Sequence, residues 1–298
     1  MGILNVTPDS FSERGVYFDR KAAIARGLEV EREGADILDI GGESTRPGAQ
    51  PVDADEELER TIPVIEALMK KGLRIPISVD TYKAQVAERA IQAGADIVND
   101  VSGLRFDGAL AAVAARTRAA VVLMHMRGTP LTMQKLPPVR NALSAVRSGL
   151  AESVRKALRA GIAKRRIVLD AGLGFGKTAE QNFELLNALH RIASLGYPVL
   201  VGPSRKSFIR TALAIEQQGI RAAHSTLLRA VSESRTATAS ERGGLAKEKG
   251  AAVPEELLFG TAAAVTAAIL NGAHIVRVHD VQQMLPVVRV ADRLLAAV

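Results

Sequence analysis

The sequence predicts an α/β fold of the (β/α)₈ TIM barrel type. Short apolar runs alternate with longer amphipathic stretches, which is typical of parallel strands joined by crossover helices. Eight such units fit into the 298 residues, and eight is the number that closes a barrel. The predicted strands also end in polar or glycine-rich segments, as the active-site face of a barrel requires. The structural alternative is a doubly wound open sheet, which usually has fewer strands.

The predicted elements follow one another in order along the chain. The strands are short and apolar, and they lie at residues 2–6, 35–40, 75–80, 95–99, 119–124, 167–170, 198–202 and 273–278. The helices are amphipathic, and they lie at 19–33, 53–71, 82–93, 107–117, 140–160, 179–195, 204–216 continued by 255–271, and 281–297. A weak internal repeat supports this division, because Gly34, Gly94 and Gly272 each stand at a predicted helix–strand junction. Gly adopts positive φ without strain, so these glycines should end helices where strands begin.

We expect residues 1–298 to form a single barrel domain that carries one insertion. Residues 217–253 are rich in Ser, Thr, Ala, Arg and Glu, and they interrupt the alternation between strand seven and the last part of helix seven. Such a composition favours a mobile or partly helical segment. Without it the chain has about 260 residues, close to the ~250 that are typical of this barrel.

Composition excludes several classes of site. The chain has no Cys, which excludes disulfides, thiolate metal sites and a cysteine nucleophile. No apolar run is long enough for a transmembrane helix, and residues 1–6 lack the pattern of a signal peptide. We therefore expect a cytoplasmic protein without a membrane partner.

The net charge of +7 indicates an affinity for anions. Aromatic residues make up only 3% and Trp is absent, so the stacking platforms that bind single-stranded nucleic acid are scarce. This favours an anionic small-molecule substrate over nucleic acid. An RNA-associated basic protein stays open as an alternative, which salt-dependent RNA binding would support.

Two kinds of polar residue stand at the predicted strand ends. Asp80, Asn99 and Asp170 supply acceptors, which suit a ligand rich in N–H donors. Arg277 and His279 supply donors and positive charge, which suit phosphate. They are two positions apart, so both face the same side of their strand. A ligand with a donor-rich heterocycle at one end and phosphate at the other would satisfy both groups.

Single residues at these positions also have structural interpretations. A lone Asp at a strand end is more often a helix N-cap than a ligand contact. Glu43 and Asp100 can cap or brace loops, and His125 is equally well a buried structural histidine. We expect His190 and His224 to lie on the surface. The polar ends of all eight strands, taken together, are harder to explain by chance.

The run from Gly172 to Thr178, GLGFGKT, is similar to a phosphate-binding P-loop but does not match it. A P-loop needs Gly at the position that Ala171 occupies here. Metalloprotease zinc motifs and the serine nucleophile elbow are absent from the sequence. Lys206 follows its strand beside Arg205, a setting that suits anion binding as well as Schiff-base chemistry.

Eight motifs occur in order over nearly the whole chain. The two most specific ones are residues 1–12, MGILNVTPDSFS, and 41–48, GGESTRPG; the others lie at 77–81, 99–100, 123–126, 170–177, 201–207 and 276–280. Together they resemble the signatures of the dihydropteroate synthases, a family of pterin-binding TIM barrels. The resemblance implies a homodimeric transferase of folate biosynthesis, the target of sulfonamides. It would condense 4-aminobenzoate with 6-hydroxymethyl-7,8-dihydropterin pyrophosphate to give 7,8-dihydropteroate and pyrophosphate.

The resemblance also assigns the substrate contacts residue by residue. The implied pterin contacts are Asp80, Asn99, Met124, Asp170, Gly202 and Lys206. The implied pyrophosphate contacts are Asn5, Arg46, Arg277 and His279, with Asn5 acting through Mg²⁺, the implied cofactor. The implied 4-aminobenzoate contacts are Phe11, Thr45, Pro47, Phe175, Lys206 and Ser207. The implied catalytic residues are Asp80, Lys206, Arg277 and His279.

We expect a dissociative substitution, in which pyrophosphate leaves the pterin methylene before the amine attacks. The loops at 6–18 and 43–53 would close over the reaction and exclude water. One alternative is a pterin-binding methyltransferase domain, which would not need the motif at 46–48 or that at 204–207. Another is a non-catalytic pterin-binding homologue that keeps the pocket but has lost turnover.

Overall fold

The computed structural model describes residues 1–7, 19–214 and 255–297, and it confirms the predicted TIM barrel. The strands are β1 (Gly2–Asn5), β2 (Leu38–Gly41), β3 (Ile77–Asp80), β4 (Ile97–Asp100), β5 (Ala120–Met124), β6 (Ile167–Asp170), β7 (Val199–Val201) and β8 (Ile275–Val276). They pair in parallel and in chain order. A parallel bridge between Gly2 and Val278 joins the last segment to the first. The open-sheet alternative is therefore wrong.

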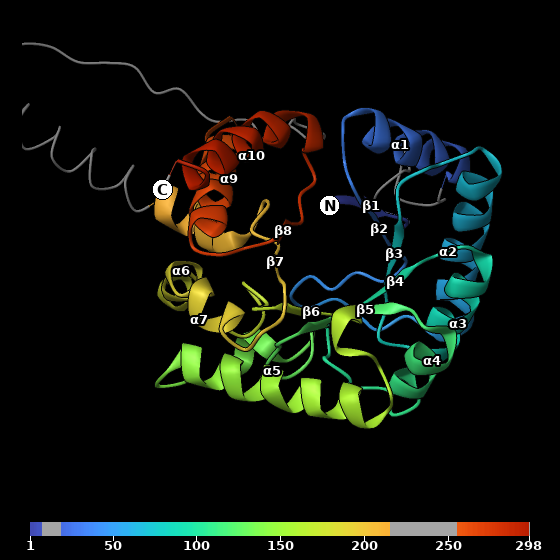
Figure 1. Cartoon of the computed structure of the whole chain (residues 1–298), viewed down its shortest axis with the longest axis horizontal. Helices are drawn as coiled ribbons and strands as arrows, with labels where there is room; N and C mark the ends of the chain where they lie inside the picture. The colour runs from blue at the N-terminus through green and yellow to red at the C-terminus, as the bar shows by residue number, and fades with distance from the viewer. Residues whose placement is uncertain (8–18, 215–254, 298) are drawn as a thin grey trace, which may run out of the picture.

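The helices surround the strands in chain order (Figure 1). They are α1 (Arg20–Arg32), α2 (Ala54–Lys70), α3 (Ala84–Ala93), α4 (Leu110–Thr117), α5 (Ala142–Arg159), α6 (Ala179–Asn187), α7 (Leu189–Ala193), α9 (Glu255–Leu270) and α10 (Val281–Leu295). Residues 207–214 are helical as well, and two 3₁₀ turns are η2 (Met133–Lys135) and η3 (Lys164–Arg166). The single helix predicted over 179–195 is wrong, because the structure divides it at Ala188, where φ is −110°.

Local sequence signals explain where helices begin and end. Asp19 and Asp53 cap α1 and α2 through their side chains, as short acceptors do at N-caps. The three glycines of the repeat, Gly34, Gly94 and Gly272, all have positive φ, at 95°, 118° and 100°. This confirms their predicted place between helix and strand. The insertion at 217–253 lies outside the described residues. None of the helices in the described part of the chain combines the length and the apolar character needed to cross a membrane.

The interior of the barrel is apolar at its amino end and polar at its carboxyl end. Side chains alternate along a strand, so Ile37 shares a face with Asp39, and Ile97 shares one with Asn99. Residues at the amino end form one apolar cluster, made of Met1, Ile37, Ile97, Val122, Val168, Leu200 and Ile275. A larger cluster packs the outer strand faces against the helices. The two apolar layers leave the carboxyl end of the barrel free for polar residues.

Candidate active site

A buried group of ion pairs crosses the barrel interior at the carboxyl ends of the strands. Arg277 Nε donates to Asp39 Oδ2 at 2.5 Å, and Arg277 Nη2 donates to Asp80 Oδ2 at 2.7 Å. Asn99 Nδ2 donates to the same oxygen of Asp39 at 3.2 Å. These bonds connect β2, β3 and β4 to the residue that follows β8.

Burial dominates the electrostatics of this group. It raises the pKa of the Asp80 carboxyl, and the guanidinium of Arg277 opposes that shift. Burial lowers the pKa of Arg277, but Asp39 and Asp80 outweigh it, so the guanidinium stays charged. Asp39 Oδ1 and Asp80 Oδ1 are buried without a hydrogen-bond partner among the described residues. Unsatisfied acceptors cost free energy, and a ligand with N–H donors would satisfy them.

A second group lies at the end of β6. Asp170 Oδ1 accepts from Gly172 N at 2.7 Å. Lys206 Nζ donates to Leu173 O and lies 4.6 Å from the ring centroid of Phe175. Burial raises the pKa of Asp170, against the effect of Lys206. Burial also lowers the pKa of Lys206 to about 8, against the effect of Asp170. The pair offers an acceptor and a donor beside an aromatic ring.

The loop after β6 is held from within by Lys177. Its Nζ donates to three backbone carbonyls, those of Gly172 at 2.7 Å, Phe175 at 3.0 Å and His125 at 3.1 Å. Gly172 has a φ of 64°, and a Cβ there would lie 2.0 Å from His125 O. Only Gly fits a position with both constraints. The GLGFGKT run therefore forms a compact loop that sets Phe175 beside Lys206.

His279 lies at the edge of the central group. The Oγ atom of Ser204 is 3.0 Å from His279 Nδ1. Burial lowers the pKa of His279 to about 3, and the charges of Arg205 and Arg277 contribute. The imidazole is therefore neutral near pH 7 and offers a hydrogen bond rather than a positive charge. Arg205 is paired with Asp280, whereas Arg277 is paired with Asp39 and Asp80.

Comparison with known proteins gives a family. A model described as "Pterin binding enzyme" matches residues 1–279, which is more than nine-tenths of the chain. The chain belongs to this family of pterin-binding enzymes.

Curated relatives of this pterin-binding enzyme are named dihydropteroate synthase. The one from Synechocystis sp. is 45% identical over 294 residues, covering 99% of this chain and 89% of the relative. The one from Bacillus subtilis is 42% identical, covering 99% and 88%. Among solved structures, that of Clostridium difficile FolP in the presence of pteroic acid has a TM-score of 0.80 at 40% identity, covering 99% and 95%. The Yersinia pestis synthase with a sulfonamide drug complex has a TM-score of 0.81 at 34% identity, covering 100% and 94%.

Most residues that the sequence predicted for the site of this pterin-binding enzyme are close together. The members of the two groups described above are Asp80, Asn99, Asp170, Phe175, Lys206 and Arg277. Met124 is buried in the same apolar cluster as Phe175. A Cβ on Gly202 would lie 3.8 Å from Arg277 Cβ and 4.0 Å from Arg277 Cδ, so this glycine borders the aliphatic part of the Arg277 side chain. Their roles toward substrates stay predictions.

The remaining predicted residues lie nearer the rim. Asn5 is half-buried at the end of β1, Thr45 is half-buried, and Arg46 and Pro47 are exposed. The Arg46 charge is among the smaller ones that lower the pKa of His279, after burial and the charges of Arg205 and Arg277. Ser207 is exposed at the start of the helical residues 207–214. Phe11 lies outside the described residues.

Two residues of the site were missed by sequence reasoning. Asp39 lies inside β2 rather than at its end, so the strand-end rule did not select it. The available signal was its position two residues before Gly41, which places both residues on the same, inward face of the strand. Lys177 was set aside with the failed P-loop match. The structural interpretation of Asp100 is confirmed, because its carboxylate accepts from Ser102 N and Leu104 N and braces the loop. That of His125 is not confirmed, because the residue is only half-buried and its Nδ1 has no hydrogen-bond partner among the described residues. His190 is exposed as predicted, and His224 lies outside the described residues.

Proposed function

We propose that this chain is a dihydropteroate synthase that joins 4-aminobenzoate to 6-hydroxymethyl-7,8-dihydropterin pyrophosphate and releases pyrophosphate. The observation that carries the proposal is the buried group of Asp39, Asp80 and Arg277. It is set in a chain whose curated relatives from Synechocystis sp., Bacillus subtilis and Escherichia coli, at 45%, 42% and 39% identity, bear that name. The barrel interior holds carboxylate oxygens without hydrogen-bond partners and a charged guanidinium. This combination suits a substrate that has a donor-rich ring and an anionic leaving group.

The pterin would lie between the carboxylates of Asp80 and Asp170. Each offers acceptor oxygens to the amino group and ring N–H groups of the heterocycle. Asn99 and Lys206 add polar contacts, and the buried side chain of Met124 and the bare backbone of Gly202 would border the ring. The burial of these groups strengthens each hydrogen bond, because little water competes there.

Mg²⁺ is the proposed cofactor and Asn5 its proposed protein ligand. Asn5 Oδ1 and Asp80 Oδ2 each lie 3.8 Å from where a Cβ on Gly41 would be, so two side-chain oxygens border this glycine. Mg²⁺ prefers oxygen, keeps several waters and often binds phosphates with only one or two protein ligands. When bound, it would supply positive charge to the pyrophosphate. Residues 1–7, 19–214 and 255–297 contain no cluster of three or more His, Asp or Glu that could hold a metal alone.

In the proposed reaction, the bond between the pterin methylene carbon and the pyrophosphate oxygen breaks first. The bonding electrons leave with pyrophosphate, whose charge Arg277 and Arg46 offset and to which neutral His279 donates a hydrogen bond. The Asp80 carboxylate stabilises the positive charge left on the pterin. The nitrogen of 4-aminobenzoate then forms the new C–N bond and gives up one proton to solvent. Lys206 would hold the pterin, and Thr45, Pro47, Phe175, Lys206 and Ser207 would border the amine, for which Phe11 is a further predicted contact.

We also propose that the enzyme is a cytoplasmic homodimer and binds sulfonamides in place of 4-aminobenzoate. Exposed apolar residues on two packed helices support the dimer; they are Phe259 on α9 and Val290, Leu294 and Leu295 on α10. The Yersinia pestis relative with a sulfonamide drug complex supports inhibition of this kind.

Release of pyrophosphate by the purified chain, given the pterin pyrophosphate and Mg²⁺, tests the proposal. We expect release that depends on added 4-aminobenzoate. Release of equal rate without the amine would indicate hydrolysis and contradict the synthase function. Pterin binding without any release would favour the non-catalytic homologue.

A further inference from the structure

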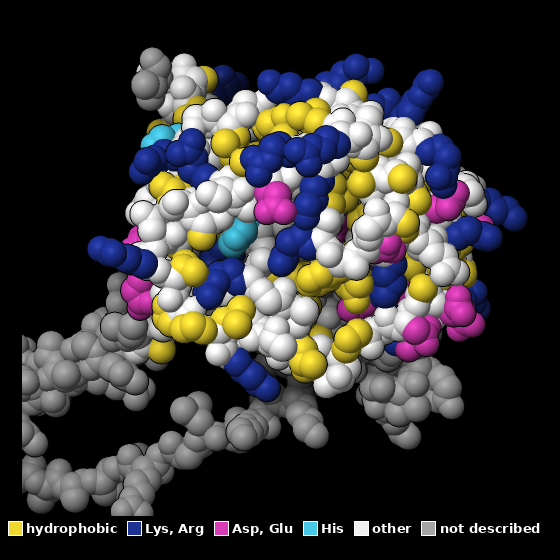
Figure 2. Space-filling view, turned by 90° about the horizontal axis from the view of Figure 1, so that it is seen from below, with side chains coloured by type: hydrophobic (Ala, Val, Ile, Leu, Met, Phe, Trp, Pro, Cys, Tyr) yellow, Lys and Arg dark blue, Asp and Glu magenta, His cyan; other side chains and the backbone are white. Residues whose placement is uncertain are grey.

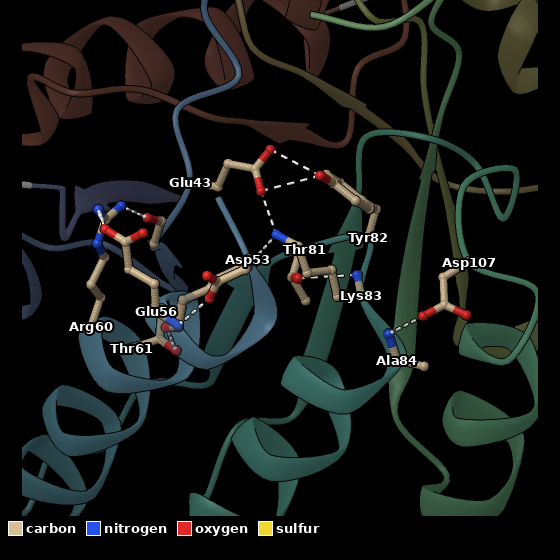
Figure 3. Close-up of polar contacts among 12 residues, drawn as sticks. Glu43, Asp53, Glu56, Arg60, Thr61, Thr81, Tyr82, Lys83, Ala84 and Asp107 are labelled. Carbon is tan, nitrogen blue, oxygen red and sulfur yellow. Dashed lines mark hydrogen bonds and ion pairs between the residues drawn. The ribbon is translucent and has the colours of Figure 1, made fainter. Parts of the chain in front are cut away.

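Four side chains form a buried cluster beside the predicted site, which we call the loop anchor: Glu43, Glu57, Tyr82 and Lys83. Lys83 Nζ donates to Oε2 of Glu43 and to Oε2 of Glu57. The hydroxyl of Tyr82 lies 3.0 and 3.2 Å from the two carboxylate oxygens of Glu43. Figure 3 shows the Glu43 carboxylate meeting Tyr82 and Lys83, which follow β3. The cluster thus joins three separate parts of the chain.

The charges of the loop anchor are almost fully removed from water. The side chains of Glu43, Glu57 and Lys83 are 7%, 1% and 14% exposed. Burial lowers the pKa of Lys83, but Glu57 and Glu43 raise it by more, so the ammonium stays charged. Burial raises the pKa of Glu57, against the effect of Lys83. Removing one member would leave the others as uncompensated buried charges.

The loop anchor fixes the start of the loop that carries the predicted aminobenzoate contacts. Glu43 directly precedes residues 44–48. Arg60 Nη1 donates to Gly42 O at 2.7 Å, and a Cβ on Gly42 would lie 2.7 Å from Thr61 Cγ2. The backbone at this point is therefore clamped against α2. At its far side the loop meets residue 130, because Gly48 N donates to Pro130 O at 3.0 Å.

Stability alone does not require a charged cluster here. Apolar side chains of similar volume often replace a buried ion pair without loss of stability. A carboxylate that is held from two sides has a fixed orientation, because hydrogen bonds depend on angle as well as on distance. Because Glu43 directly precedes residues 44–48, its fixed orientation also restricts where the backbone of these residues begins.

We propose that the loop anchor sets the affinity of the enzyme for its aromatic amine substrate by positioning the loop after β2. The proposal rests on the proposed function and names Glu43, Glu57, Tyr82 and Lys83 as positioning residues, since none of them is assigned a contact with substrate. The pterin contacts Asp80, Asn99 and Asp170 come from the ends of β3, β4 and β6 and not from this loop. The effect should therefore fall on one substrate of the two.

The test is steady-state kinetics on the full chain with both substrates, for Lys83→Met, Lys83→Arg and the control Lys156→Met. Lys156 also pairs with a glutamate, Glu152, at 3.2 Å, but on the exposed face of α5. We expect Lys83→Met to raise the KM for 4-aminobenzoate about tenfold, equivalent to ~1.4 kcal/mol. The KM for the pterin pyrophosphate should stay within about twofold. Lys83→Arg should restore part of the difference, and the control should match the wild type.

Equal rises in both KM values, or no change in the KM for 4-aminobenzoate, would overturn the inference. If Lys83→Met does not fold, Tyr82→Phe provides the test. We then expect a smaller rise in the KM for 4-aminobenzoate and no change in the KM for the pterin pyrophosphate. A wild-type chain that forms no product would instead refute the proposed function. The two failures are thus separate.

Discussion

The loops after β2 and β6 are both held at their base by a buried lysine, but the two lysines face different partners. Lys83 donates to two carboxylates, those of Glu43 and Glu57, whereas Lys177 donates to three backbone carbonyls. The carboxylates keep the pKa of Lys83 above its ordinary value despite burial. Burial lowers the pKa of Lys177 to about 7, and the charge of Lys206 adds to the effect.

This difference shows how the partner decides the behaviour of a buried charge. A carboxylate carries a full negative charge, whereas a carbonyl has only a dipole. The carbonyl therefore compensates the charge of an ammonium less well. The ion-paired loop should keep its anchor across the neutral pH range. The loop after β6 should respond to pH, because its lysine can lose its proton near neutrality.

The largest expected effect separates the two lysines by stability. Lys83→Met leaves Glu43 and Glu57 buried without their cation, so we expect the free energy of unfolding to fall by about 3–5 kcal/mol. Lys177→Met leaves three carbonyls unpaired but also removes an uncompensated buried charge, so we expect a loss of about 1–3 kcal/mol. Urea denaturation at pH 7 measures both. A larger loss for Lys177→Met would contradict the comparison.

The glycines of the two loops provide a second comparison. In Gly172→Ala the new Cβ would lie 2.0 Å from His125 O, and we expect a loss of about 2–4 kcal/mol. Gly48 also has positive φ, at 81°, but nothing lies within 4 Å of its Cβ position. Gly48→Ala should therefore cost only about 1 kcal/mol. Similar losses for the two variants would show that the loop after β6 is not tightly packed against β5.

The strand-end rule explains what the sequence could predict. Asp80, Asn99, Asp170 and Arg277 were selected because they stand where strands of a barrel end, and the structure brings them together. Lys177 escaped the rule because its partners are backbone carbonyls, which leave no trace in the sequence. The pairing of Glu43 with Lys83 also has no local signal, because 40 positions separate them. Such contacts are decided by packing in three dimensions.

The pH dependence of stability sharpens the comparison further. Between the lowered pKa of about 7 and the ordinary value of 10.5, the unfolded chain binds a proton at Lys177 that the folded chain lacks. Lys177 should therefore make the free energy of unfolding rise with pH, by up to about 1.4 kcal/mol for each pH unit. Urea denaturation at pH 7, 8 and 9 should show this slope in the wild type and in the surface control Lys156→Met, and Lys206 should add to it above its own pKa of about 8. If Lys177→Met keeps the same slope, another group is responsible.

The smallest expected effect comes from the tyrosine of the loop anchor. Tyr82→Phe removes one hydrogen bond to Glu43 but leaves Lys83 in place, so we expect a loss of about 0.5–1.5 kcal/mol. Tyr197→Phe is the matched control, since within the described residues the Tyr197 hydroxyl has no hydrogen bond. Its ring, which the substitution keeps, has its centroid 5.4 Å from Lys164 Nζ. Thermal or urea unfolding measures both. An equal loss in the control would assign the effect to the ring environment instead.

Conversion of labelled 4-aminobenzoate to 7,8-dihydropteroate tests the central claim most directly, with wild type, Arg277→Ala and the control Arg116→Ala. Arg116 pairs with Glu88 at 2.6 Å on the surface, whereas Arg277 pairs with Asp39 and Asp80 inside the barrel. We predict product from the wild type, an unchanged control, and a loss of about 100-fold in kcat/KM for Arg277→Ala, equivalent to ~2.7 kcal/mol. No product from the wild type, or a wild-type rate in Arg277→Ala, would contradict the account.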